Sequence, residues 1–300
     1  MKMRVRTAIF AALAIAVGAV NAGAWGWDAH RWITAAAVDL LPSDMRGVVV
    51  HERDALAEHA PSPDLWRSDP EESHGHYINP ELADPSGPPF SAIPRTYGEA
   101  LAAFGIDSLR KMGTLPWRIE DYYHRLVASM RQPTDSTWVI MAALGHYCSD
   151  ATMPMHVTVN YDGQMTGNRG IHFRFEWWML DQHADEIALG PVAPLLVADP
   201  LDAAWPVIFD SYAEIDTLLA ADADVRRTFR EPVQNPDDRH GRGPDADYDA
   251  RLFRRLGEIA IRRMELAAQF TAGIWYAAWL EAGRPDLTSV PSPPPPPVAE

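Results

Sequence analysis

Helical periodicity is the feature that most constrains the fold of this chain. Apolar residues recur at the spacing of an α-helix in long segments, and strand-like alternation never persists beyond a few residues. We expect helices over Asp28–Leu41, Thr96–Lys111, Trp117–Met130, Thr137–Ser149, Ile171–Ile187, Leu201–Ala221 and Tyr248–Leu280. Gly105 and Gly113 are candidate breaks, and the Asp/Gly/Pro-rich stretch Asn235–Asp247 predicts an exposed loop. The sequence therefore predicts an all-α protein, a single-domain helical bundle.

The N-terminal segment is typical of an export signal. Three basic residues precede an apolar run from Ala8 to Val20, and a pattern of small residues suited to cleavage ends at Ala24. The apolar run is too short to cross a bilayer comfortably. We therefore expect residues 1–24 to be a signal peptide, with no transmembrane anchor and a periplasmic or secreted mature chain that begins at Trp25. That mature domain should span residues 25–285, and the Pro-rich residues 286–300 should form a disordered or extended tail.

Composition narrows the classes of function. The 300 residues include 26 Lys and Arg against 41 Asp and Glu, a formal net charge of −15, which becomes −18 when the three basic residues of the leader are removed. This acidic balance argues against a basic surface that wraps DNA, so we expect no stable binding of duplex DNA. A single cysteine, Cys148, excludes a disulfide framework and a Cys-rich zinc site. Any metal must be held by His, Asp and Glu.

Two histidine–carboxylate pairs at helical spacing indicate where such a metal could bind. His146 and Asp150 are four residues apart, and so are His172 and Glu176, so each pair should share one helix face. A proline after the first pair predicts a turn that brings His156 back toward the same space. One such pair alone is more often a surface ion pair than a metal site. Imidazole and carboxylate donors without thiolate suit zinc, with iron or manganese as alternatives.

These residues form a pattern, His-x3-Asp-x5-His followed by Gly-Asn and His-x3-Glu, that resembles the zinc-dependent phospholipase C / S1–P1 nuclease superfamily. The pattern stands here as His146, Asp150, His156, Gly167-Asn168, His172 and Glu176. Further elements that match are Trp25-Gly26 with His30, then Asp64 with Arg67, then His76-Tyr77-Ile78-Asn79. The resemblance runs from Trp25 to about Leu180. Asp69 is the competing choice for the position of Asp64.

The resemblance implies a helical bundle that holds three zinc ions. It assigns Asp64, His76 and His146 to one zinc, with Asp150 bridging to another; His156, His172 and Glu176 to the second; and His30, Asp150 and the amine and carbonyl of Trp25 to the third. A free α-amine can lose its proton to a metal, whereas an amide nitrogen cannot readily do so. Cleavage after Ala24 would therefore also be an activation step.

The activity that the resemblance implies is hydrolysis of phosphodiester bonds by a metal-activated water. Asp64 would orient or deprotonate that water, and Arg67 would bind a phosphate oxygen unless it pairs with a nearby surface carboxylate. Tyr77 and Asn79 should contact the substrate, with Tyr77 stacking on a base or lining a lipid headgroup pocket. Phospholipid and single-stranded nucleic acid both stay open as substrates, and no protein partner is predicted. The alternative is a zinc-stabilised binding or structural protein without catalysis.

Overall fold

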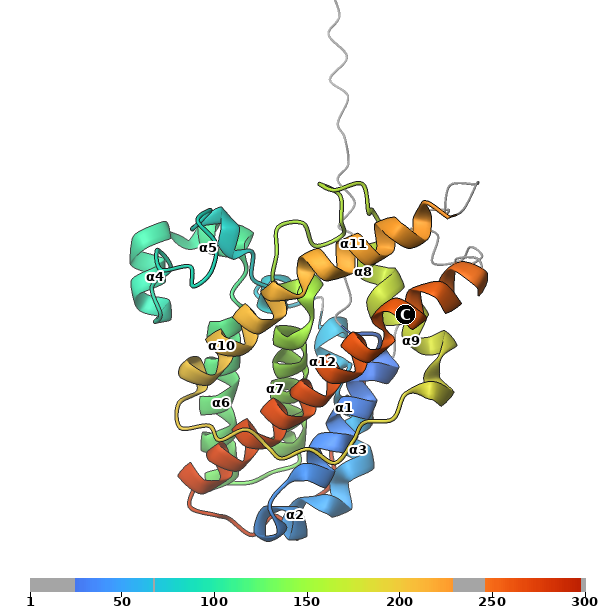
Figure 1. Cartoon of the computed structure of the whole chain (residues 1–300). Coiled ribbons are helices and arrows are strands. Elements are labelled where there is room, and N and C mark those ends of the chain that lie inside the picture. Colours follow the sequence, from blue (N-terminus) through green and yellow to red (C-terminus); the bar gives the residue numbers. More distant parts are fainter. Residues whose placement is uncertain (1–24, 67, 229–245, 298–300) are drawn as a thin grey trace, which may run out of the picture.

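The computed structural model describes residues 25–66, 68–228 and 246–297, and these residues form helices and connecting loops with no strand (Figure 1). The prediction of an all-α, single-domain fold is confirmed. The predicted signal peptide (residues 1–24), Arg67 and most of the predicted loop at 235–247 lie outside the described residues. Among the described helices, none is both long and apolar enough to cross a membrane.

The α-helices in chain order are α1 (Trp27–Leu40), α2 (Ser43–Val49), α3 (Arg53–His59), α4 (Tyr97–Phe104), α5 (Ile106–Met112), α6 (Leu115–Arg131), α7 (Ser136–Thr152), α8 (Ile171–Phe173), α9 (Met179–Gln182), α10 (Pro200–Ala213), α11 (Ile215–Arg226) and α12 (Ala246–Glu281). Short 3-10 turns are η1 (Val50–Glu52), η2 (Ser62–Leu65), η3 (Ser73–Gly75), η4 (Pro80–Leu82), η5 (Pro154–His156) and η7 (Ala184–Glu186). The segment η6 (Arg174–Trp178) is a π-helix between α8 and α9.

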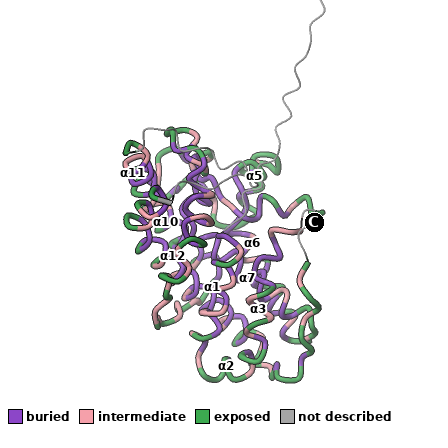
Figure 2. The backbone as a smooth tube through the Cα atoms, turned by 90° about the vertical axis from the view of Figure 1, so that its right-hand side faces the viewer, coloured by how far each residue is buried: buried purple, intermediate pink, exposed green. Residues whose placement is uncertain are grey.

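Helix α7 runs through the centre of the bundle. It packs against α6, α12, α3, α10 and α1, and every residue from Met141 to Thr152 is buried (Figure 2). A helix that is apolar on all faces is expected inside a protein, and the run Trp138–Leu144 meets that condition. Asp135 caps the N-terminus by accepting a hydrogen bond from Ser136 N. The helix therefore carries its C-terminal residues into the middle of the protein.

Two of the expected helices are divided. The helix predicted over Thr96–Lys111 is split into α4 and α5 at Gly105, whose φ of +72° lies in the left-handed region that ends helices. The helix predicted over Leu201–Ala221 is split into α10 and α11 at Glu214, whose backbone N–H turns back to Ser211 O. The helix predicted over Ile171–Ile187 ends earlier, at Gln182, after passing through the π-helix.

The described part of the C-terminal tail, residues 286–297, for which the sequence left an extended and a disordered form open, contains no helix or strand and is held on the bundle by hydrogen bonds. Trp138 Nε1 donates a hydrogen bond of 3.1 Å to Pro291 O, and His59 Nε2 lies 2.7 Å from Pro294 O. Prolines lack a backbone N–H and favour extended chain, so they offer their carbonyls to neighbouring donors. The tail is thereby held against α3 and α7.

Candidate metal centre

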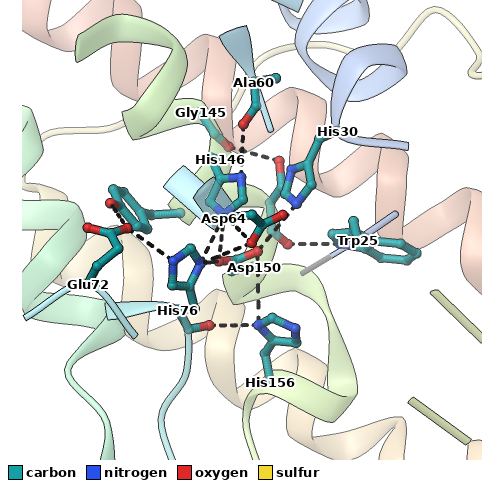
Figure 3. A network of polar contacts seen from close by, with 12 residues as sticks. Trp25, His30, Ala60, Asp64, Glu72, His76, Gly145, His146, Asp150 and His156 are labelled. Atoms are coloured by element: carbon teal, nitrogen blue, oxygen red, sulfur yellow. Dashed lines mark hydrogen bonds and ion pairs between the residues drawn. The ribbon is translucent and has the colours of Figure 1, made fainter. Parts of the chain in front are cut away.

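The predicted histidine and carboxylate ligands come together around the C-terminal half of α7, and Figure 3 shows those that surround Asp150. They form three groups whose donor atoms lie within 4.8 Å of one another: His30, Asp64 and His146; His76, His146 and Asp150; and His156, His172 and Glu176. Residues up to 146 positions apart in the sequence thus meet in one buried region. The first two groups share His146, and His156 of the third group lies 3.9 Å from Asp150 Oδ1, so the donors are contiguous.

Asp150 lies at the centre of these donors. Its Oδ2 atom is 3.0 Å from His76 Nδ1 and 3.4 Å from His146 Nε2. Its Oδ1 atom is 3.6 Å from His30 Nε2 and 3.9 Å from His156 Nδ1. Burial raises the pKa of Asp150 to about 7. A carboxylate with histidines at both oxygens has the placement that a ligand bridging two metals needs.

Asp64, and not Asp69, reaches this region. The η2 turn places Asp64 Oδ1 3.7 Å from His146 Nε2 and 3.9 Å from His76 Nδ1. Asp69 instead accepts a hydrogen bond of 2.8 Å from the backbone N–H of Glu71 in an exposed turn. Of the two carboxylates that the sequence left open for this position, Asp64 is therefore the one that lies among the donors.

The third group combines His156 from η5, His172 from α8 and Glu176 from the π-helix η6. His172 Nε2 lies 2.9 Å from Glu176 Oε2, and His156 Nε2 lies 3.6 Å from the same oxygen. Burial lowers the pKa of His172 to about 4 and raises the pKa of Glu176 to about 8. The imidazole is therefore held in its neutral form, which is the form that binds metals. The predicted four-residue spacing holds, although the local turn is of the π type, which is frequent at functional sites.

Two of the histidines are oriented by backbone carbonyls. His146 Nδ1 lies 2.9 Å from Ala60 O, and His156 Nδ1 lies 2.7 Å from His76 O. Each contact occupies Nδ1, so Nε2 is the ring nitrogen left to face the other donors. Such outer hydrogen bonds fix the ring and tautomer of metal-ligating histidines.

Glu72 also belongs to this region, and the sequence reasoning missed it. Its side chain is buried, with Oε1 3.0 Å from His76 Nε2 and accepting a hydrogen bond of 2.6 Å from Tyr147 OH. The available signal was its spacing of four residues before His76. That signal was weak because the segment between them is a 3-10 turn and not a helix.

Trp25 is wedged between α7 and the π-helix. Its side chain is fully buried, its Nε1 donates a hydrogen bond of 2.9 Å to Ser149 O, and Gly26 N donates one of 3.1 Å to Glu176 O. The residue with which the mature chain is predicted to start therefore contacts α7 at Ser149, and its neighbour Gly26 contacts the π-helix at Glu176.

The predicted substrate contacts lie on the segment after His76. Tyr77 is half-buried and donates a hydrogen bond of 3.2 Å to Arg110 O, and Asn79 is buried. Tyr161, which the sequence did not single out, is 40% exposed, and its ring centroid is 6.4 Å from that of His172. These two tyrosines are aromatic faces near the donors.

The donor chemistry fits a bound metal. Both ring nitrogens of His30, Oδ1 of Asp150 and Nε2 of His156 are buried without a hydrogen-bond partner. Each unpaired buried polar group costs about 1–3 kcal/mol, so such a group of lone pairs in one place indicates a cation. The donors are nitrogen and oxygen only, which agrees with zinc and does not distinguish it from iron or manganese.

Comparison with known proteins adds little to this geometry. No protein-family model matches the chain. A probable serine protease of Bradyrhizobium tropiciagri is 23% identical over 197 residues, which cover 59% of this chain. The chain matches about a quarter of that protein's length (25%). At this identity and coverage, the similarity assigns no family.

Proposed function

We propose that the chain is an exported, zinc-dependent phosphodiesterase. The observation that carries the proposal is the convergence of histidines and carboxylates on Asp150, with buried nitrogen and oxygen atoms that have no protein partner. A structural zinc site uses four closed ligands, whereas a larger set of shared donors leaves positions for water and substrate. The histidine and carboxylate donors are those of the ligand set that the family resemblance implies, and the amine and carbonyl of Trp25 enter the proposal from that resemblance alone.

In this proposal the donors hold three zinc ions as the resemblance distributes them. The ions would be held by Asp64, His76, His146 and Asp150; by His156, His172 and Glu176; and by Trp25, His30 and Asp150. When bound, zinc supplies a water whose pKa is lowered to about 7 and positive charge opposite the phosphate. The acidic net charge of the chain does not oppose a phosphate substrate, because divalent ions would make the site itself positive.

Asp64 is the carboxylate best placed to act on the reacting water. Asp150 is fully buried among histidines, whereas the side chain of Asp64 retains 7% exposure on the short η2 turn. A carboxylate at the edge of the donors can orient a water and take up its proton. The exposed ring of Tyr161 and the half-buried Tyr77 offer faces for a base or a lipid headgroup.

The second candidate is a serine peptidase, which the name of the distant relative raises. Ser62 Oγ lies 3.4 Å from His59 Nδ1, a serine–histidine pair. The other ring nitrogen of His59 faces the carbonyl of Pro294, where a catalytic triad has a carboxylate. Both residues of the pair are buried. This geometry favours a structural role for the pair. Both candidates are hydrolases.

One set of assays tests the proposal. The full chain, exported by a bacterial host, is offered bis(p-nitrophenyl) phosphate, single-stranded DNA, RNA and phosphatidylcholine, before and after chelation and after return of zinc. We expect turnover of a phosphodiester that chelation abolishes and zinc restores.

Two histidine variants give a matched comparison for these assays. His146→Ala should lose activity, whereas His124→Ala, on the exposed face of α6, should not. Full zinc occupancy without turnover of any phosphodiester would refute the proposed activity. Casein hydrolysis that survives chelation and disappears in Ser62→Ala would favour the peptidase.

A further inference from the structure

We infer that Glu72 is a positioning residue that sets the orientation of the His76 ring. In this orientation His76 presents Nδ1 to the candidate metal centre, whereas His146 and His156 present Nε2. The inference rests on the metal centre of the proposed function. It assigns a role to a residue that lies outside every motif in the sequence.

The ring of His76 is held between two carboxylates (Figure 3). Its Nε2 atom faces Glu72 Oε1 at 3.0 Å, and its Nδ1 atom faces Asp150 Oδ2 at 3.0 Å. The Nδ1 atom also lies 3.0 Å from His146 Nε2. Because Asp150 and His146 belong to the donor set, Nδ1 is the nitrogen on the side of the metal.

His146 and His156, whose rings also contact a group outside the donor set, have the opposite orientation. His146 and His156 each turn Nδ1 outward to a backbone carbonyl. A neutral carbonyl accepts a ring N–H, but a carboxylate accepts it more strongly and increases the donor strength of the opposite nitrogen. His76 thus differs from its neighbours both in the nitrogen it offers and in the charge behind it.

Glu72 is itself fixed by α7. Tyr147 follows His146 on that helix and donates its hydroxyl hydrogen to Glu72 Oε1 at 2.6 Å. The side chain of Glu72 is only 5% exposed, so water cannot readily replace either partner. A buried carboxylate needs compensation, which the Tyr147 hydroxyl and the Nε2 side of His76 provide at Oε1. The contact therefore ties the loop that carries His76 to the helix that carries His146 and Asp150.

The backbone of His76 also contacts the group of donors that contains His156. The carbonyl oxygen of His76 accepts the contact from His156 Nδ1 at 2.7 Å, and Ile78 N donates to His156 O at 2.9 Å. The side chain of His76 therefore serves one group and its backbone orients a ligand of the next. Loss of Glu72 should loosen both.

The test uses Glu72→Ala and Glu72→Gln in the full chain, with Glu71→Gln as the matched control. Glu71 is the adjacent residue, but its partly exposed side chain pairs with Arg110 and His74. Zinc content and affinity are measured by competition with a chelator. Two-dimensional 15N–1H spectra of histidine-labelled protein identify the metal-bound and protonated nitrogens of His76, assigned with His76→Gln.

We expect zinc on Nδ1 and a proton on Nε2 of His76 in the wild type. Glu72→Ala should weaken zinc binding about 10–100-fold, the usual effect of losing an outer-shell partner. Glu72→Gln, which keeps an acceptor oxygen, should lose less, and Glu71→Gln should match the wild type. If Glu72→Ala does not fold, the Glu72→Gln protein and the wild-type spectrum still decide the question.

Zinc bound to Nε2 of His76, unchanged zinc affinity in folded Glu72→Ala, or no zinc binding by the wild type would each overturn the inference. A protein that binds zinc with the expected spectrum but hydrolyses no phosphodiester would refute the proposed activity and support the role of Glu72. The two failures are therefore distinguishable.

Discussion

The buried ion pair between Arg174 and Asp222 should decide how firmly the helix with His172 and Glu176 is held. Arg174 lies between these two predicted ligands, and its Nη2 atom is 2.9 Å from Asp222 Oδ1 on α11. Asn168 Nδ2 donates to Asp222 Oδ2 at 2.8 Å. Both charged side chains are buried: that of Arg174 is 1% exposed and that of Asp222 is 0% exposed.

Asp222→Ala should therefore remove much of the stability of the chain. The substitution leaves a buried guanidinium without its counter-charge, which costs about 3–5 kcal/mol when one partner of a buried pair is deleted. For a domain of this size, about 2–4 °C per kcal/mol converts this to a fall in Tm of roughly 6–20 °C. The assay is thermal unfolding followed by circular dichroism, in chelator, so that metal binding does not contribute.

Asp224→Ala is the matched control, because it makes the same change two residues away on the same helix. Asp224 pairs with Arg227 and Arg255 on the exposed face. Surface pairs contribute about 0–1 kcal/mol, so the Tm should change little. A loss below about 1 kcal/mol for Asp222→Ala, or equal losses for both variants, would show that the reasoning about the buried pair is wrong.

The remaining predictions concern glycine positions, one buried carboxyl, the metal and the N-terminus. Gly113→Ala should destabilise the fold by about 1–3 kcal/mol, because φ is +91° and a Cβ would lie 2.1 Å from Tyr77 O. Gly98→Ala, in open space on α4, should stabilise by about 0.4–1 kcal/mol; urea unfolding compares the two. Burial raises the pKa of Asp249 to about 6, above the unfolded value of about 3.9. The folded state thus holds this proton more tightly, so Asp249 should contribute a loss of stability as pH rises from about 4 to about 6. Asp249→Asn should make the measured fall in urea titrations smaller. Chelation should lower the Tm, and zinc should restore it; no change would argue against a bound metal. Extra residues retained before Trp25 should lower zinc content and activity, as measured by elemental analysis and by phosphodiester assay.

The sequence predicted the parts of the site that depend on local chain geometry. His146 with Asp150, and His172 with Glu176, needed only a helix and a spacing of four residues, and both pairs lie face to face. The break between α4 and α5 at Gly105 likewise depends on one residue with positive φ, which the glycine itself indicates.

The parts that the sequence did not predict depend on contacts between distant segments. Glu72 acquires its place from Tyr147, 75 residues away. The tail is held by Trp138, 153 residues before its partner Pro291. Prolines indicated that this segment forms no helix, but nothing in their spacing indicated which donors would meet their carbonyls.

The donors of the candidate metal centre are supported by two different kinds of structure. His146 and Asp150 stand on a helix that is packed on all sides, so they can move only if the core of the bundle opens. Asp64 lies on the 3-10 turn η2, and His76 directly follows the 3-10 turn η3. These turns are tied to the bundle by individual hydrogen bonds, such as the one from Thr114 N to His74 O at 2.7 Å.

This difference sets where the site should first come apart. An individual hydrogen bond contributes about 0.5–1.5 kcal/mol, whereas opening α7 requires loss of the cooperative core. We therefore expect the described residues around these two turns, 61–66 and 68–79, to open locally while α7 keeps its form. Asp64 and His76 then leave together, because both lie on that segment. The carboxylate that orients water in the proposed reaction thus depends on the same loop that Glu72 anchors, and stability of the bundle as a whole does not guarantee an intact centre.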